Sequence, residues 1–136
     1  MIVHCDTREQ RPPPVPAGVE LVRATLAEAD YSTPKLVDIA RIERKSAVDL
    51  VGSLTHGRER FEREADRLMK YEFRCIVVEG SAADVSRLGR IHANALIGSL
   101  ASLHSRWGLP TIFLSSPEAV GRYIAGVLRR LEEAVK

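Results

Sequence analysis

Two acidic residues and a lysine, Asp30, Glu43 and Lys45, could together form a metal-dependent hydrolytic site. Glu43 and Lys45 lie two positions apart at the end of a predicted strand, so their side chains leave one face and Arg44 points to the other. Asp30 lies at the hairpin that returns as the Glu43 strand, so it can approach the same end of the sheet. Converging carboxylates suit Mg²⁺ or Mn²⁺, and a neighbouring lysine can orient or deprotonate water or stabilise charge on phosphorus. The three residues are the minimum for metal-assisted phosphodiester hydrolysis.

Two further acids lie where they could complete such a site. Asp6 follows the first apolar run, where a neighbouring strand could deliver another carboxylate to the metal. Asp49 falls in the first helical turn after Lys45. The alternative is a solvated strand end with surface ion pairs, because an acid followed by Glu-x-Lys is common by chance. Four acids and a lysine at strand ends and a helix start favour the site.

The elements that must position these residues follow from the hydrophobic periodicity. Short apolar runs predict strands at residues 1–5, 19–26, 36–42, 74–79 and 111–114. Stripes at helical spacing predict helices at residues 58–72, at 92–106 and from the Ser116 N-cap to about Val135. The prolines of residues 11–16 predict an extended loop. Strands that alternate with helices in the second half indicate an α/β fold with a central mixed sheet flanked by helices.

Composition limits what the chain can be. Its 136 residues, 45% hydrophobic and 28% charged, are typical of a single globular domain. A net charge of +2 excludes a polycation, so binding to nucleic acid requires a local basic surface. No apolar run approaches the roughly 18 residues of a membrane span, and we expect no membrane partner. Two cysteines are too few for a disulfide framework, so we expect an intracellular location, in the cytoplasm and nucleoid or in a nucleus.

Several segments, in the right order along nearly the whole chain, resemble the nuclease domain of the XPF/Mus/Hef (ERCC-type) structure-specific endonucleases. The residues that carry the resemblance are Val-His-Cys-Asp-Thr-Arg-Glu at 3–9, Ala-Asp-Tyr at 29–31, Ile-Glu-Arg-Lys-Ser-Ala-Val-Asp at 42–49, Ser-Leu-Thr-His-Gly-Arg at 53–58, Ile-Val-Val-Glu-Gly at 76–80 and Ser-Ser-Pro-Glu at 115–118. The resemblance implies a restriction-endonuclease-like core that cuts DNA at branches, flaps or junctions with a divalent metal.

The resemblance also implies a role for each matching residue. Asp30 and Glu43 correspond to metal ligands, Asp6 to a further acid of the metal site, and Lys45 to the group that faces water or phosphate. Arg44 lies beside the site and Asp49 braces it. Arg8 and Arg58 match positions near the site, and Arg58 and Arg60, on the helix after the motif, are the arginines best placed to contact the DNA backbone. These expected DNA-binding residues are Arg8, Arg58 and Arg60.

The chain departs from the family pattern at two points. Ala29 replaces the glycine before the motif's aspartate, a change that is strained if the backbone there has a positive φ. The second concerns domain content: we expect residues 1–136 to hold the nuclease domain alone, without the helix-hairpin-helix or helicase modules of family enzymes. We therefore expect a separate DNA-binding or helicase protein as a partner.

The apolar faces of the last two helices bear on assembly. Family cores dimerise through these helices, so we expect a homodimer. The alternative function is that of a non-catalytic DNA-binding or dimerisation subunit, because the family contains partner chains with degraded sites. Such partners lose the acids or the lysine, whereas Asp30, Glu43, Lys45 and Asp49 are all present here.

Overall fold

The computed structural model describes residues 1–135, which form a mixed sheet and five helices. The strands are β1 (Ile2–Asp6), β2 (Glu20–Ala24), β3 (Tyr31–Ser32), β4 (Ala40–Ser46), β5 (Phe73–Glu79) and β6 (Thr111–Leu114). The helices are α1 (Ala47–Leu54), α2 (Arg58–Leu68), α3 (Ala82–Gly89), α4 (Ala93–Trp107) and α5 (Pro117–Ala134). Among these described residues no helix is long and apolar enough to cross a membrane.

The six strands form one sheet in the order β2-β1-β3-β4-β5-β6. β1 runs parallel to β2, and β4, β5 and β6 run parallel to one another. The two-residue β3 is antiparallel to both of its neighbours, β1 and β4. This short strand therefore brings the segment just before it, which contains Asp30, to the end of β1 and the middle of β4. The expected hairpin between the strand at 19–26 and the Glu43 strand is not formed, because β2 pairs with β1 at the edge of the sheet and β3 is the strand that pairs with β4.

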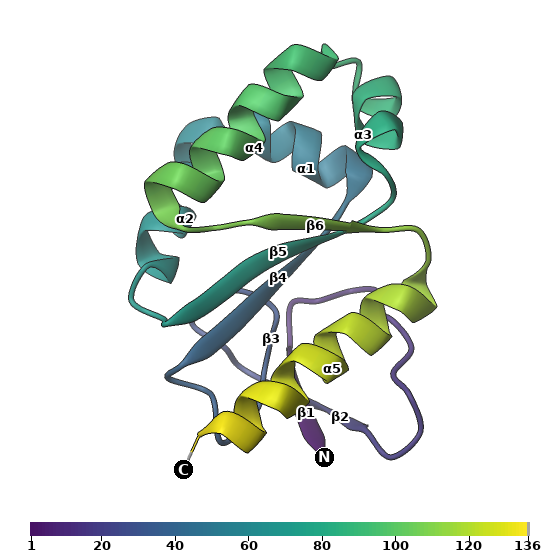
Figure 1. The fold of residues 1–136 in the computed structure, drawn as a ribbon, viewed down its shortest axis with the longest axis vertical. Coiled ribbons are helices and arrows are strands. Elements are labelled where there is room, and N and C mark those ends of the chain that lie inside the picture. Colours follow the sequence, from purple (N-terminus) through teal and green to yellow (C-terminus); the bar gives the residue numbers. More distant parts are fainter. Residues whose placement is uncertain (136) are drawn as a thin grey trace.

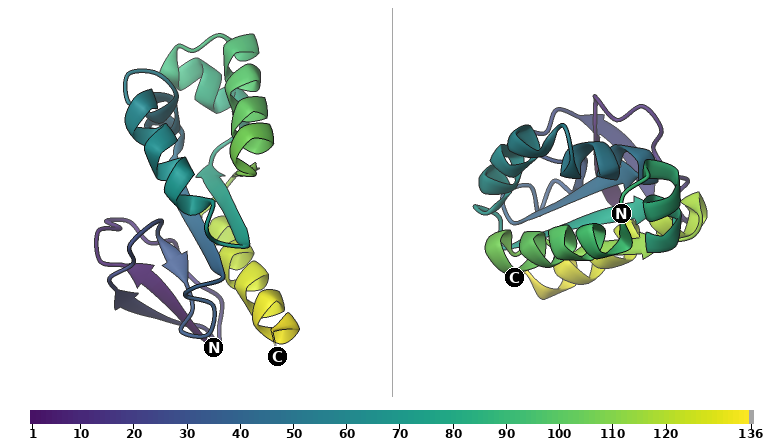
Figure 2. Two further views of the ribbon diagram at one scale, coloured as in Figure 1. Left: turned by 90° about the vertical axis from the view of Figure 1, so that its left-hand side faces the viewer. Right: turned by 90° about the horizontal axis from the view of Figure 1, so that it is seen from above.

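Helices cover the two faces of the sheet unequally, as Figure 1 shows: α1 to α4 lie over one face of the β4–β6 half, and α5 crosses the other face. Figure 2 shows β1 to β3 beside α5 and away from the α1–α4 layer. One core contains Ile76 and Val78 of β5 with residues of α1 to α4. The other contains Cys75 and Val77 of β5 with residues of β1, β3, β4 and α5. Because side chains alternate between the two faces along β5, this strand contributes residues to both cores.

The structure confirms the predicted fold class and most predicted elements. The strands at 1–5, 74–79 and 111–114 and the helices at 92–106 and from Ser116 appear within one or two residues of their expected limits. The strand at 19–26 shortens to β2, and the helix at 58–72 ends at Leu68. Residues 11–16 form no helix or strand.

The predicted strand at residues 36–42 is wrong in its first half. The segment before Ala40 is a series of tight turns, in which the amides of Leu36 and Ile39 donate to the carbonyls of Thr33 and Leu36. The strand instead runs from Ala40 to Ser46, so that Glu43 lies in its middle and Lys45 next to its last residue. Buried apolar side chains occur in both the turns and the strand, and periodicity does not separate them. The hydrophobic periodicity does not predict α3, which begins with a capping box between Ser81 and Asp84.

Candidate functional site

The centre of the candidate site is a pair of carboxylates, Asp30 before β3 and Glu43 within β4. The backbone fixes Asp30 in three ways: its amide donates to the Ile42 carbonyl (3.0 Å), its carbonyl accepts from the Asp6 amide (2.7 Å), and its Oδ2 accepts from the Arg44 amide (2.8 Å). Burial, the charge of Glu43 and a hydrogen bond with the Glu43 carboxyl raise the pKa of Asp30 well above its usual range. Asp30 therefore favours its protonated form, and a cation can replace that proton.

The residue before Asp30 has a strained backbone. Ala29 has a φ of 63°, in the left-handed region that favours glycine. The replacement of the family's glycine by Ala29 therefore strains the backbone, as expected for a positive φ at this position. A left-handed alanine persists only where the surrounding structure fixes it, and such residues concentrate at functional sites.

Asp6, at the end of β1, supports the turn that follows it. Its Oδ1 accepts a hydrogen bond from the Leu26 amide (2.9 Å), and its Oδ2 accepts from the Arg8 amide (3.1 Å) and Nε (2.6 Å). Burial alone would raise the pKa of Asp6, but these hydrogen bonds outweigh it and hold that pKa below its usual value. Both oxygens of Asp6 are thus engaged in shaping the rim of the site.

Lys45 lies beside Glu43 on the same side of β4, as the strand alternation predicts. Its Nζ is 3.5 Å from Glu43 Oε2 and 4.9 Å from the centre of the Phe61 ring on α2. The side chains of Lys45 and Glu43 are only 13% and 15% exposed. The partly desolvated ammonium therefore sits between an aromatic face and a carboxylate, where its charge is screened little by water.

A cavity of about 240 Å³ opens over the carboxylate pair. Its charged lining residues are Asp6, Arg8, Glu28, Asp30, Glu43, Glu64 and Arg67. Four of these were predicted as site residues from the sequence. Glu28, Glu64 and Arg67 were not, and the alternating charges of residues 58–72 gave no signal that would single out the last two.

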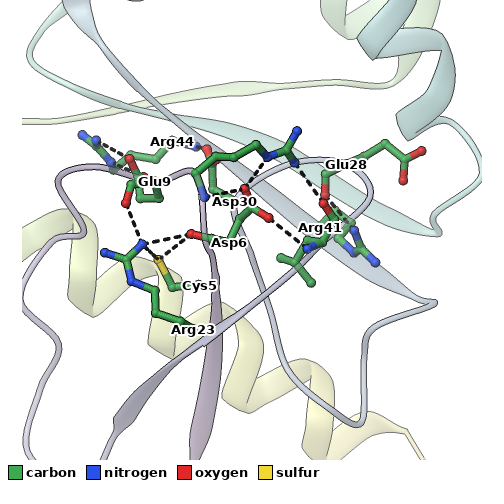
Figure 3. A network of polar contacts seen from close by, with 10 residues as sticks. Cys5, Asp6, Glu9, Arg23, Glu28, Asp30, Arg41 and Arg44 are labelled. Atoms are coloured by element: carbon green, nitrogen blue, oxygen red, sulfur yellow. Dashed lines mark hydrogen bonds and ion pairs between the residues drawn. The ribbon is translucent and has the colours of Figure 1, made fainter.

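Arg44 and Asp49 lie away from this cavity. The guanidinium of Arg44 donates to both carboxylate oxygens of Glu9, from Nε (2.7 Å) and Nη2 (2.8 Å), and Tyr31 Oη donates to Glu9 Oε2 (3.0 Å). Figure 3 shows this pair on the opposite side of Asp6 and Asp30 from Arg41. Arg44 and Asp49 line a second, larger cavity, and Arg8 lies on the rim of both.

The two remaining predicted DNA-binding residues are on α2. Arg58 pairs with Glu62 one turn along the helix, with 3.3 Å between Arg58 Nε and Glu62 Oε2, and Arg60 is exposed. Neither lines the cavity that contains Asp30 and Glu43. Arg67, further along the same helix, does.

The donor set fits a hard divalent cation. Within residues 1–135, no group of three or more His, Cys, Asp or Glu side chains is arranged to hold a metal. Mg²⁺ typically uses one or two carboxylates and completes its shell with water and substrate phosphate. Asp30 and Glu43 supply those two carboxylates, and burial together with the neighbouring charge of Glu43 raises the pKa of Asp30.

Comparison with known proteins places the chain in a family. The profile of the ERCC4 domain matches residues 5–127. The chain belongs to the ERCC4 domain family. Two structures of XPF from Aeropyrum pernix, one of them in complex with DNA, superpose on this ERCC4 domain with TM-scores of 0.80 and 0.81 and sequence identities of 29% and 30%. They cover 98% and 96% of this chain, so the mixed sheet with its flanking helices is the XPF nuclease fold.

The ERCC4 domain accounts for only part of its relatives. It covers 66% and 61% of the two XPF chains. A protein of Methanocaldococcus jannaschii, whose name describes an ATP-dependent RNA helicase, is 34% identical over 102 residues, 75% of this chain and 12% of that protein. The similarity therefore concerns a nuclease-type domain that occurs within longer proteins.

Proposed function

We propose that this ERCC4 domain is a divalent-metal-dependent endodeoxyribonuclease that hydrolyses phosphodiester bonds in branched, flap or junction DNA. The observation that carries the proposal is the buried Asp30–Glu43 pair, with Lys45 beside it, under a cavity in an XPF nuclease fold. The assembly of the carboxylates and the lysine in one place supports this proposal over the alternative, a non-catalytic DNA-binding or dimerisation subunit.

Asp30 and Glu43 would hold Mg²⁺ or Mn²⁺, and Asp6 would support them by fixing the end of β1. A cation held there supplies a Lewis acid that neutralises charge developing on the phosphate. Lys45, fixed against Phe61, would orient the attacking water or stabilise the phosphate charge. Arg8 and Arg67 line the mouth of the cavity, where a phosphodiester backbone would approach. Arg58, Arg60 and Asp49 would act further from the scissile bond.

Cleavage of a defined substrate panel tests the proposal. Single-stranded, duplex, flap, fork and four-way-junction DNA are incubated with the protein in Mg²⁺, and then with EDTA. We expect cleavage of a branched substrate in Mg²⁺, none in EDTA, and a loss of at least about 100-fold in Glu43→Gln and in Lys45→Ala. Glu133→Gln, an exposed residue of α5, is the control and keeps its activity. Cleavage that persists in EDTA or in both site variants would contradict the assignment of Asp30, Glu43 and Lys45 as a metal-dependent site.

Assembly and partners form a second part of the proposal. We expect a homodimer through α4 and α5, because Ile97 of α4 is 62% exposed and Val127 of α5 lines an open apolar groove with Leu114 of β6. The net charge of +2 gives the domain little general affinity for DNA, so a DNA-binding or helicase partner, or a second copy, would supply it. Light scattering that gives the monomer mass at micromolar concentration would contradict the dimer.

A further inference from the structure

A polar network that the proposed chemistry does not use lies beside Asp30 at the edge of the same cavity. Glu28 is at its centre: Tyr71 Oη donates to Glu28 Oε2 (2.6 Å) and Lys70 Nζ donates to Oε1 (3.0 Å). The Glu28 side chain is only 9% exposed. Burial by itself raises the pKa of Glu28, but the hydrogen bonds from Tyr71 and Lys70 hold it below its usual value. Glu28 is therefore a charged group fixed at both oxygens.

Arg41 holds the backbone of the same residue. Its Nη1 donates to the Glu28 carbonyl (2.7 Å), while Nε and Nη2 donate to the Val37 carbonyl (3.1 and 2.8 Å). Its guanidinium also lies 4.5 Å from the centre of the Tyr71 ring. Arg41 is 4% exposed and belongs to β4, two residues before Glu43. Figure 3 shows Glu28 and Arg41 together on one side of Asp30.

The network and Asp30 are separated by one residue, the left-handed Ala29. A left-handed conformation is unfavourable for an alanine, so this turn needs contacts on both sides to persist. The contacts after Ala29 are those of Asp30 with Ile42 and Arg44. The contacts before it are those of Glu28 with Arg41, Tyr71 and Lys70. If the second set is lost, Ala29 can relax and Asp30 turns away from Glu43.

We propose that Glu28, Tyr71 and Arg41 are positioning residues that hold Asp30 against Glu43 and thereby set the affinity of the site for a divalent cation. The inference rests on the proposed metal site. It differs from a purely structural role, because it requires the metal affinity of the folded protein to change when the network is altered. Groups that orient metal ligands typically change metal affinity by about 10–100-fold when removed.

Binding of Mn²⁺ alone, without DNA, tests the inference by calorimetry on the full chain at a temperature where circular dichroism shows each variant folded. We expect Glu28→Ala to raise the Kd for Mn²⁺ by about 10-fold or more and Tyr71→Phe, which keeps the ring beneath Arg41, by several-fold. Glu28→Gln should stay within about twofold, because the amide oxygen still accepts from Tyr71. Glu132→Ala is the matched control: Glu132 also accepts from a hydroxyl, that of Thr33 (2.8 Å), but on α5.

The outcomes separate the two proposals. If the wild-type chain binds Mn²⁺ and Tyr71→Phe and Glu28→Ala bind it equally well, the network merely stabilises the fold and the inference is overturned. If Glu28→Ala does not fold, Tyr71→Phe alone decides the question. A wild-type chain that binds no Mn²⁺ contradicts the metal site itself, and the inference falls with it.

Discussion

The ion pair between Glu9 and Arg44 gives the most quantitative prediction, because it is buried and bidentate. The two side chains are 8% and 12% exposed, and their contacts measure 2.7 and 2.8 Å. Arg44→Met removes the cation and leaves the Glu9 carboxylate buried, with Tyr31 Oη as its remaining side-chain donor. Removing one partner of a buried pair costs about 3–5 kcal/mol, and the slight exposure of both groups favours about 3 kcal/mol.

A double-mutant cycle isolates the pair from other effects of the substitution. Glu9→Gln in the Arg44→Met background removes the unpaired charge but retains an acceptor for Tyr31 Oη. We therefore expect the double variant to be more stable than Arg44→Met by about 1–2 kcal/mol. Urea unfolding at pH 7, followed by circular dichroism, measures the free energies. A loss below about 1 kcal/mol in Arg44→Met, or no recovery in the double variant, would refute the buried-pair reasoning.

The same pair has a defined pH dependence. Burial raises the pKa of Glu9, but the hydrogen bonds and charge of Arg44 outweigh it, so the folded-state pKa lies below the unfolded one. The stabilisation is therefore complete above the unfolded pKa of about 4.3 and is lost as the pH falls through the folded value. The difference in unfolding free energy between wild type and Arg44→Met should be constant from pH 8 to 6 and narrow below about pH 5. A difference that widens on acidification would contradict this sign.

Two further predictions concern packing and the metal site. An added Cβ at Gly121 would lie 1.7 Å from the Pro14 carbonyl oxygen, so Gly121→Ala should lower the free energy of unfolding by about 2–3 kcal/mol. At Gly98 the added Cβ has nothing within 4 Å, so Gly98→Ala should raise the free energy of unfolding by about 0.5–1 kcal/mol. Urea titrations measure both changes. Millimolar Mn²⁺ should raise the Tm of the wild-type chain and leave that of Glu43→Gln nearly unchanged in differential scanning calorimetry, because only the intact carboxylate pair binds the ion in the folded state. Equal losses in both glycine variants, or equal Tm shifts, would contradict the respective prediction.

The parts of the site that depend on local periodicity could be predicted from the sequence. Glu43 and Lys45 share a face because strand side chains alternate, and this holds although the strand starts four residues later than expected. The position of Asp30 could be expected from the short return before β4. The side-chain contacts around the site could not be predicted, because the partners of Arg44 and Tyr71 lie 35 and 43 residues away in the chain. Mixed-charge segments such as residues 58–72 allow many pairings, and only the packed structure selects one.

Charge compensation distinguishes Asp30 and Glu43 from three neighbouring acids, Asp6, Glu9 and Glu28. Asp6 is neutralised by Arg8, Glu9 by Arg44, and Glu28 by Lys70. These three acids have pKa values held below their usual range, whereas the pKa of Asp30 is raised. Lys45 Nζ lies 3.5 Å from Glu43 and pairs with that carboxylate. The ion pairs of Arg8, Arg44 and Lys70 therefore fix the backbone around the site, and Asp30 and Glu43 are left as the pair that a divalent cation would neutralise.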